Sequence, residues 1–248
     1  MKVQNILISQ PPPAIESSPY LELSRSPNVK IDFRPFIEVK GVSSGEVRRQ
    51  KIDFSDFSAV IFTSKNAVDH YFRMSEDMRY KVPDDMKYVC QSETIAYYLQ
   101  KYVVYRKRKI YVGEKDFKEI LSIIRKHRKE KFLLPSSNVL KPEVPRMLSK
   151  LDVNWKRAIL YKTVSSDLSD LKDIFYDVLV FFSPAGIKSL FENFPDFEQN
   201  LVKIATFGKS TSEAASKAGL KVNIRVPTAK TSSMAMALEK YLRDHDLF

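Results

Sequence analysis

The chain has 248 residues, of which 44% are apolar and 29% charged, so it is long enough for one large domain or two small ones. This composition excludes a disordered or collagen-like chain. The 41 Lys and Arg outnumber the 30 Asp and Glu, which gives a net charge of +11 and favours an anionic partner without identifying it. Much of the charge is local, because residues 101–131 hold twelve basic and four acidic side chains.

The apolar runs and the cysteine content bear on the compartment. No run approaches the roughly 18 residues of a membrane span. The first apolar stretch, residues 6–8, is too short for a signal-peptide core and leads into three prolines. The single cysteine, Cys90, cannot form an internal disulfide, which fits a reducing compartment. We therefore expect a cytoplasmic protein with no membrane partner.

In chain order, short apolar runs alternate with helical patterns. Several runs, such as 178–182, are apolar throughout, which is typical of strands in a parallel sheet covered by helices on both faces. Between the runs lie amphipathic stretches such as 116–128. This alternation predicts an α/β fold with parallel sheets. The predicted strands are 4–9, 30–36, 59–63, 87–90, 109–112, 131–134, 157–163, 178–183, 203–207 and 221–226.

An internal repeat relates the two halves of the chain. Residues 62–68 (FTSKNAV) resemble 181–187 (FFSPAGI), and four further pairs follow at shifts between about 114 and 126. Chance similarity of apolar strands does not account for this ordered series, so we interpret the chain as two copies of one five-stranded unit. The further pairs are 90–94 with 207–211, 110–112 with 224–226, 7–9 with 133–136, and 30–36 with 156–161.

Several common catalytic motifs are incomplete. The segment 208–211 (GKST) looks like the end of a phosphate-binding loop, but Lys203 stands where that loop needs glycine. No Gly-x-Gly-x-x-Gly is present either, so a nucleotide cofactor is disfavoured. We interpret His70, His127 and His245 as surface residues and predict no metal site, because none has a Cys or His partner at ligand spacing. A serine hydrolase is disfavoured by the lack of a Gly-x-Ser-x-Gly elbow.

Five strand-to-helix junctions are rich in small hydroxyl residues. Each follows the carboxyl end of a predicted strand, where open α/β sheets bind ligands, and each opens a helix whose free N–H groups attract anions. A single junction could simply be a helix N-cap. Five of them in two copies favour a large polyanionic ligand held between two lobes. The junctions are 64–66 (SKN), 92–94 (SET), 136–138 (SSN), 183–186 (SPAG) and 209–211 (KST).

The basic stretch 101–131 has two interpretations. Its charges interleave with an apolar helix face, so they are expected to form the solvated outer side of that helix. Because Tyr102, Tyr105 and Tyr111 lie among them, a nucleic-acid surface stays open as a second interpretation.

The chain resembles the uroporphyrinogen-III synthase family in segments 59–68, 160–163, 181–186 and 205–211, and the likeness extends over nearly its whole length. The resemblance implies two similar lobes, each a parallel five-stranded sheet flanked by helices, joined by a two-stranded linker. The first lobe would be residues 1–37 with 167–248, the second 45–160, and the linkers 38–44 and 161–166. Gly41, Ser43, Ser44 and Gly45 suit a flexible connection.

The resemblance also implies an activity. The family converts hydroxymethylbilane, a linear tetrapyrrole with eight carboxylates, into a macrocycle with its last ring inverted and water lost, using no cofactor. We therefore expect a monomeric cyclising lyase of tetrapyrrole and heme biosynthesis that binds this small molecule and no nucleic acid. Two alternatives stay open: a non-catalytic two-lobed binding protein for an anionic metabolite, and a nucleic-acid-binding protein that uses residues 101–131.

Site residues are carried over by position. Tyr161 matches the tyrosine that the family offers as a proton donor to the departing hydroxyl. Two departures from the family pattern are Gln91, where glycine is more frequent, and Ser9-Gln10-Pro11, where many bacterial members carry Arg-Pro. The substrate-binding residues that we predict are Ser64, Lys65, Thr94, Ser137, Ser183, Ala185, Gly186, Lys209 and Thr211.

Overall fold

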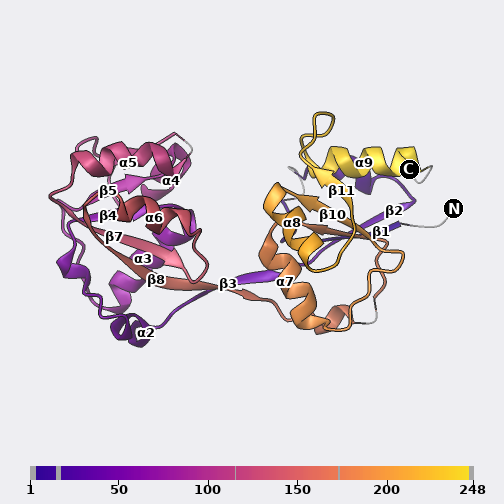
Figure 1. Cartoon of the computed structure of the whole chain (residues 1–248), viewed down its shortest axis with the longest axis horizontal. Helices are drawn as coiled ribbons and strands as arrows, with labels where there is room; N and C mark the ends of the chain where they lie inside the picture. The colour runs from indigo at the N-terminus through magenta and orange to yellow at the C-terminus, as the bar shows by residue number, and fades with distance from the viewer. Residues whose placement is uncertain (1–3, 15–17, 115, 173, 246–248) are drawn as a thin grey trace. The chain divides into compact units, whose positions relative to one another are not determined.

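The computed structural model describes residues 4–14, 18–114, 116–172 and 174–245. The chain divides into two compact units, coloured along the sequence in Figure 1. The first unit comprises Met1–Glu38 and Val164–Phe248, and the second unit comprises Val39–Thr163.

The first unit is built on a five-stranded parallel sheet with strand order β11-β10-β9-β1-β2. Its strands are β1 (Gln4–Ile8), β2 (Val29–Phe33), β9 (Val178–Phe181), β10 (Lys203–Phe207) and β11 (Val222–Val226). Its helices are α1 (Leu21–Ser24), α7 (Pro184–Asn193), α8 (Lys209–Lys217) and α9 (Met234–Asp244), with a short 3-10 helix at Ser169–Leu171.

Helices cover both faces of the first sheet. On one face Leu23 of α1 and Leu238 of α9 pack against Ile6 and Ile8 of β1. On the other face α7 and α8 cover residues such as Phe181. Strands that are apolar throughout, such as β9 with four buried residues, fit this arrangement because each face meets a helix layer.

The second unit contains a six-stranded sheet with strand order β3-β8-β7-β4-β5-β6. Strands β8, β7, β4, β5 and β6 are parallel, and β3 joins the β8 edge to make the sheet mixed. The strands are β3 (Ile37–Gly41), β4 (Ala59–Phe62), β5 (Lys87–Cys90), β6 (Ile110–Val112), β7 (Lys131–Ser137) and β8 (Asn154–Ser165). The helices are α2 (Ser44–Arg49), α3 (Lys65–Asp77), α4 (Glu93–Leu99), α5 (Phe117–Lys126) and α6 (Glu143–Ser149), with a 3-10 helix at Phe54–Asp56.

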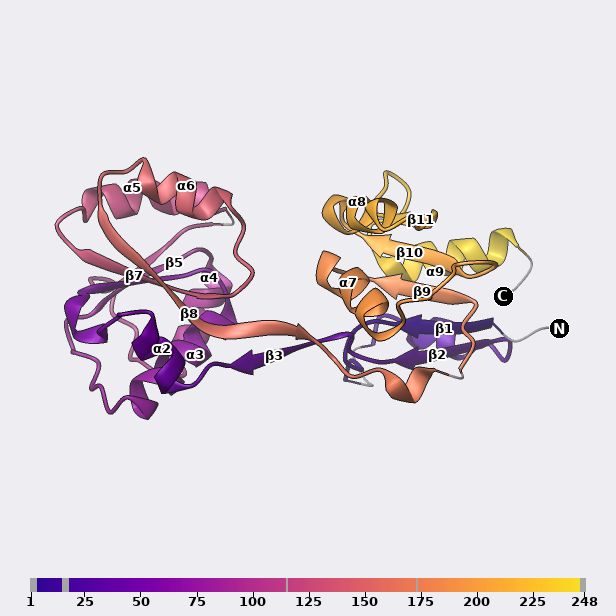
Figure 2. The same cartoon turned by 60° about the horizontal axis from the view of Figure 1, so that its bottom comes forward.

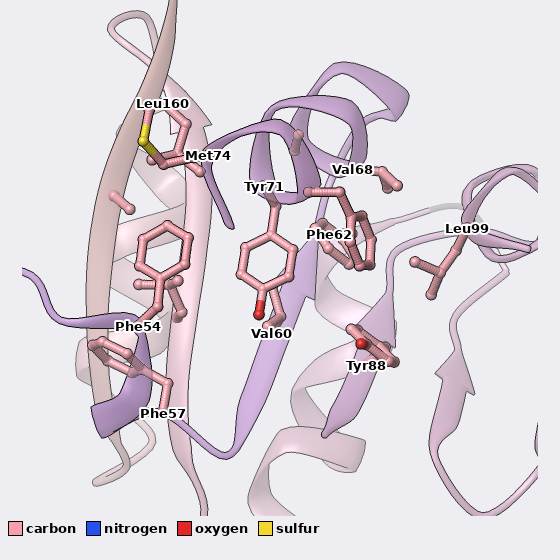
Figure 3. Packing of buried hydrophobic residues seen from close by; sticks show 14 of the residues in the cluster. Phe54, Phe57, Val60, Phe62, Val68, Tyr71, Met74, Tyr88, Leu99 and Leu160 are labelled. Atoms are coloured by element: carbon pink, nitrogen blue, oxygen red, sulfur yellow. The ribbon is translucent and has the colours of Figure 1, made fainter. Parts of the chain in front are cut away.

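The second sheet is also covered on both faces. Helices α5 and α6 pack on one side, while α2, α3 and α4 pack on the other, as Figure 2 shows for α2, α3, α5 and α6. The α3 side holds an aromatic core in which the Tyr71 ring lies between Phe54, at a centroid distance of 5.4 Å, and Phe62, at 5.6 Å. Leu160 of β8 belongs to the same core (Figure 3). The strand that leads to Tyr161 is therefore anchored in the aromatic core.

The two sheets have the same strand order when one is reversed. Order β2-β1-β9-β10-β11 in the first unit corresponds to β8-β7-β4-β5-β6 in the second. Each pair of segments related by the sequence repeat falls on corresponding strands, from β4 with β9 to β8 with β2. The strand order therefore agrees with duplication of one five-stranded unit.

Two expectations need correction. The second sheet has six strands rather than five, because residues 37–41, predicted partly as linker, form β3. Its sequence, IEVKG, alternates apolar and polar residues instead of forming a continuous apolar run, and four of its five residues are exposed. Residues 41–45 are not a flexible connection either. Gly41 ends β3, and Ser43 and Glu46 form a capping box at the start of α2.

Candidate active site

Tyr161 lies in β8 where the pairing of β8 with β7 is irregular. Ser136 pairs with Ile159 and Ser137 pairs with Tyr161, so β8 has one extra residue at this point, which is a β-bulge. Successive side chains of a regular strand point to opposite faces. Leu160 and Tyr161 are nevertheless 0% and 6% exposed and belong to the same apolar cluster. The bulge thus re-aims the Tyr161 ring, as bulges beside functional sites often do.

The Tyr161 hydroxyl forms a hydrogen bond of 3.0 Å with the Ser64 Oγ. Ser64 is the N-cap of α3, and its Oγ also accepts the Ala67 amide at 3.0 Å. A serine hydroxyl has one donor and two acceptor sites, so Ser64 can still donate to the Tyr161 oxygen or accept from it. The helix cap thereby fixes the partner of the phenol.

Burial adds to the preference of the Tyr161 phenol for its protonated form. Loss of solvent raises the pKa of Tyr161 above its ordinary value of 10.0, and the Ser64 hydrogen bond opposes part of this rise. The phenol therefore carries its proton at neutral pH. In that state it can donate a proton to a ligand atom, which is the task of a general acid.

A cavity of about 460 Å³ lies beside this pair within the second unit. The cavity is lined by Ser64, Tyr161, Gln91 and Ser137. Its remaining wall combines two more hydroxyl residues and apolar side chains with two lysines and two carboxylates: Thr63, Ser136, Phe117, Val139, Leu140, Val144, Met147, Lys118, Lys141, Asp116 and Glu143. This mixed lining suits a ligand that has both flat apolar rings and charged groups.

Three residues of the second unit that were predicted to bind substrate have side chains that are not free to do so in the cavity or do not line it. The Ser137 hydroxyl donates to the Val139 carbonyl at 2.5 Å and accepts the Val139 amide at 3.1 Å, so a local turn already occupies it. Lys65 and Thr94 are exposed in the first turns of α3 and α4, and neither lines the cavity. Lys65 instead places its Nζ 5.3 Å from the centre of the Tyr98 ring.

In the first unit, Ser183 occupies the place of Ser64. It is the N-cap of α7, and its Oγ accepts the Gly186 amide at 3.1 Å. Pro184 has no N–H, and the Gly186 amide is engaged with the cap, so the Ala185 amide is what the first turn of α7 can offer to an anion.

The start of α8 is more open. Its N-cap is Gly208, whose φ of +86° is a conformation that side chains disfavour. The Lys209 side chain is 91% exposed, and Gly208 and Lys209 both line a second cavity of about 640 Å³. Thr211 as a whole residue is 1% exposed. A ligand at this helix end would therefore meet Lys209 rather than Thr211.

His70 is not the plain surface residue that the sequence suggested. It is half-buried in α3, and its ring lies on the Tyr161 ring with a centroid distance of 4.8 Å and an angle of 16°. Sequence reasoning also missed Arg73, which contacts His70. A helical wheel gives one weak signal: His70 lies three residues after Ala67 and one before Tyr71, both buried, at the border of the buried face.

The described residues hold no group of three or more His, Cys, Asp or Glu that could bind a metal ion. Within the same residues, no helix has the length and apolar character needed to cross a membrane.

The chain matches a known protein family along most of its length. The model of uroporphyrinogen-III synthase HemD matches residues 20–236. A search of curated proteins returned no significant match.

Two solved structures share the fold. A uroporphyrinogen-III synthetase from Helicobacter pylori is 19% identical, with a TM-score of 0.60 over 97% of this chain and 99% of that one. A mutant uroporphyrinogen III synthase from Thermus thermophilus is 13% identical, with a TM-score of 0.58 over 98% of this chain and 99% of that one. At these identities, the likeness describes the fold alone.

Proposed function

Because the chain belongs to the uroporphyrinogen-III synthase family of cyclising lyases, we propose that Tyr161 is the proton donor of the reaction and that Ser64 assists it. The protein cyclises hydroxymethylbilane with inversion of the last ring and loss of water, in tetrapyrrole biosynthesis. One observation carries the proposal for Tyr161: its buried hydroxyl, bonded to Ser64 at 3.0 Å, lines the cavity of the second unit.

The reaction needs an acid at its start and a base at its end. The hydroxymethyl group leaves as water only if its oxygen receives a proton, and Tyr161 can supply that proton because its phenol is protonated at neutral pH. The phenolate that remains is stabilised by the Ser64 hydroxyl, which has its proton free to donate. Ring closure then releases a proton from the attacking pyrrole carbon, and the phenolate can take it back. No net proton is consumed.

Binding of the eight carboxylates falls to helix N-termini. We assign this role to the first-turn amides of α3, α7 and α8, which carry unsatisfied N–H groups and the positive end of the helix dipole. The predicted residues Ser64, Ser183, Ala185, Gly186, Lys209 and Thr211 belong to these three helix ends. We assign Lys65, Thr94 and Ser137 a smaller share of the carboxylate binding, because their side chains are placed less favourably for it.

We propose that the two units are the two lobes of the enzyme and that it acts as a monomer in the cytoplasm without nucleic acid. The buried Cys90 thiol supports a reducing compartment, because no second cysteine is present to pair with it.

A product assay tests the function. Freshly prepared hydroxymethylbilane is incubated with the protein, and the uroporphyrinogen isomers are resolved after oxidation. We expect isomer III, formed faster than spontaneous closure gives isomer I. Isomer I alone at the spontaneous rate would contradict the function and would favour the non-catalytic binding protein.

A further inference from the structure

The Tyr161 ring is held from its face as well as from its hydroxyl. His70 lies on it at 4.8 Å with only 16° between the two planes, a stacked arrangement. His70 and Ser64 both belong to the region where α3 begins, six residues apart, so one helix contacts both the face and the hydroxyl of the phenol. The orientation of the imidazole therefore determines how the phenol can tilt.

Arg73 fixes the orientation of that imidazole. Its Nε donates to the His70 Nδ1 at 3.2 Å, and its Nη2 donates to the carbonyls of Val42 at 2.9 Å and Leu160 at 3.2 Å. Leu160 is the residue directly before Tyr161. One planar guanidinium thus connects α3, the imidazole and the strand that carries the phenol, a geometry that the single ammonium of lysine cannot reproduce.

Gly41 provides the space for this guanidinium. A Cβ at position 41 would lie 2.9 Å from both the Arg73 Cζ and the Arg73 Nη2, closer than such atoms normally approach. Glycine at the end of β3 therefore lets the guanidinium lie close to the backbone. An added Cβ would therefore force the guanidinium to shift from its present place.

We propose that Arg73 and His70 are positioning residues for Tyr161, with Arg73 fixing the plane and tautomer of the imidazole and the imidazole fixing the phenol against Ser64. The inference rests on the proposed role of Tyr161 as proton donor. Neither residue touches the departing oxygen in this account, so both act through the orientation of the phenol.

The charge state of His70 follows from the same geometry. Because Nδ1 accepts from Arg73, the ring proton of the neutral imidazole lies on Nε2. Burial and the Arg73 charge both lower the pKa of His70, while Asp69 of α3 opposes them. The other titratable group packed on the ring is Tyr161 of β8, which is neutral at this pH. A neutral imidazole therefore faces the phenol under working conditions.

Nitrogen-15 spectra of the histidine side chains test this arrangement in the free enzyme. The chain has three histidines, so comparison with a His70→Phe variant assigns the His70 signals. We expect an unprotonated Nδ1 and a protonated Nε2 at neutral pH. A protonated Nδ1, in either the neutral or the charged ring, would overturn the inference.

A double-mutant cycle tests the positioning role. Arg73→Lys should lower kcat by about tenfold, a coupling in the range measured for contacting residues, with KM changed by less than about twofold. In the Tyr161→Phe background, the same substitution should have no further effect on kcat, because the hydroxyl that it positions is gone. Loss of the same factor in both backgrounds would show a merely structural role and overturn the inference.

Two companion variants sharpen this cycle. Gly41→Ala should reproduce the Arg73→Lys effect, since it displaces the guanidinium without removing any of its groups, and it serves if Arg73→Lys does not fold. Asp77→Asn breaks the exposed ion pair between Arg73 Nη1 and the Asp77 carboxylate, 2.6 Å long, and should leave kcat within about twofold because Nε and Nη2 keep their partners. If Tyr161→Phe alone leaves kcat unchanged, the proposed function of Tyr161 fails. If Tyr161→Phe lowers kcat while the cycle is additive, the positioning role alone fails.

Discussion

The two units have the same five-stranded parallel core, yet corresponding strands differ in length between them. In the first unit, β2 stops after five residues at Phe33, whereas its counterpart β8 runs for twelve residues from Asn154. The added length and the bulge opposite Ser136 and Ser137 carry Tyr161 to the capping serine of α3. Ser183 caps α7 in the same way as Ser64 caps α3, but among the described residues no tyrosine bonds to it.

The difference shows how a duplicated fold can divide its tasks. Both copies keep the helix N-termini that suit anion binding, because strand, cap and helix are common to them. The proposed acid depends on an extension of one strand in one copy. We infer that both units bind carboxylates and that the second unit supplies the acid.

The largest expected effect comes from the hydroxyl of Tyr161. Tyr161→Phe should keep the packing of the ring and lower kcat by about 10²-fold, the lower end for a general acid, since the pyrrole already helps to expel the leaving group. KM should change little, because the bond strengthens as charge develops on the oxygen. Steady-state rates with hydroxymethylbilane measure both constants.

The matched control removes a tyrosine hydroxyl from the first unit. Tyr176 donates to the Asp32 carboxylate at 3.2 Å and lies outside the proposed machinery. Tyr176→Phe should therefore leave kcat within about twofold. Equal losses in the two variants would mean that the units do not differ as proposed.

A second comparison concerns the loops before α4 and α8. Gly208 has φ +86° and ψ 148°, and nothing lies within 4 Å of an added Cβ, so Gly208→Ala should lower the free energy of unfolding through backbone strain alone, by about 2 kcal/mol. Its counterpart Gln91 is not among the described non-glycine residues with positive φ, so Gln91→Gly should cost less than about 1 kcal/mol. Urea unfolding measures both. A larger loss of unfolding free energy in Gln91→Gly than in Gly208→Ala would contradict this difference between the two loops.

The capping serines offer a closer comparison. Ser64→Ala and Ser183→Ala should each lower the free energy of unfolding by about 1 kcal/mol, because each removes an N-cap. Only Ser64→Ala should also lower kcat, by about tenfold, since it removes the donor to the phenolate. Denaturation and steady-state kinetics on both variants provide the measurement, and equal kcat values for the pair would count against the assignment.

The smallest expected effect is a flat pH profile. Burial raises the pKa of Tyr161 above 10.0, so the phenol stays protonated at neutral and mildly alkaline pH. It loses its proton only as the pH rises through the raised pKa. The contribution of Tyr161 to kcat should therefore stay constant between about pH 6 and 9. A descending limb below pH 9 that disappears in Tyr161→Phe would contradict this sign.

The sequence was informative wherever apolar patterning specified burial. Continuous apolar runs such as 178–181 predicted the parallel strands, and serines after them marked the starts of α3 and α7. Strand β3 was not predicted, because its side chains are mostly exposed and form no continuous apolar run. Its place depends on backbone pairing with β8 rather than on burial.

The candidate site was predicted residue by residue but not as a constellation. Resemblance pointed to Tyr161, and the junction pattern pointed to Ser64. Their hydrogen bond depends on a bulge that no local pattern announces. The interpretation of His70 as a surface residue rested on its lack of a Cys or His partner at ligand spacing, which says nothing about packing. Its contact with Tyr161 arises from the packing of α3 on β8.

We infer that the hydroxyls of Tyr161 and Ser64 in the second unit act together in proton transfer. Measuring kcat for the two single variants, Tyr161→Phe and Ser64→Ala, and for their combination tests this. We expect Ser64→Ala to lower kcat in the parent enzyme and to have no further effect once the Tyr161 hydroxyl is absent. Losses that multiply in the combined variant would contradict it, because the two hydroxyls would then act independently.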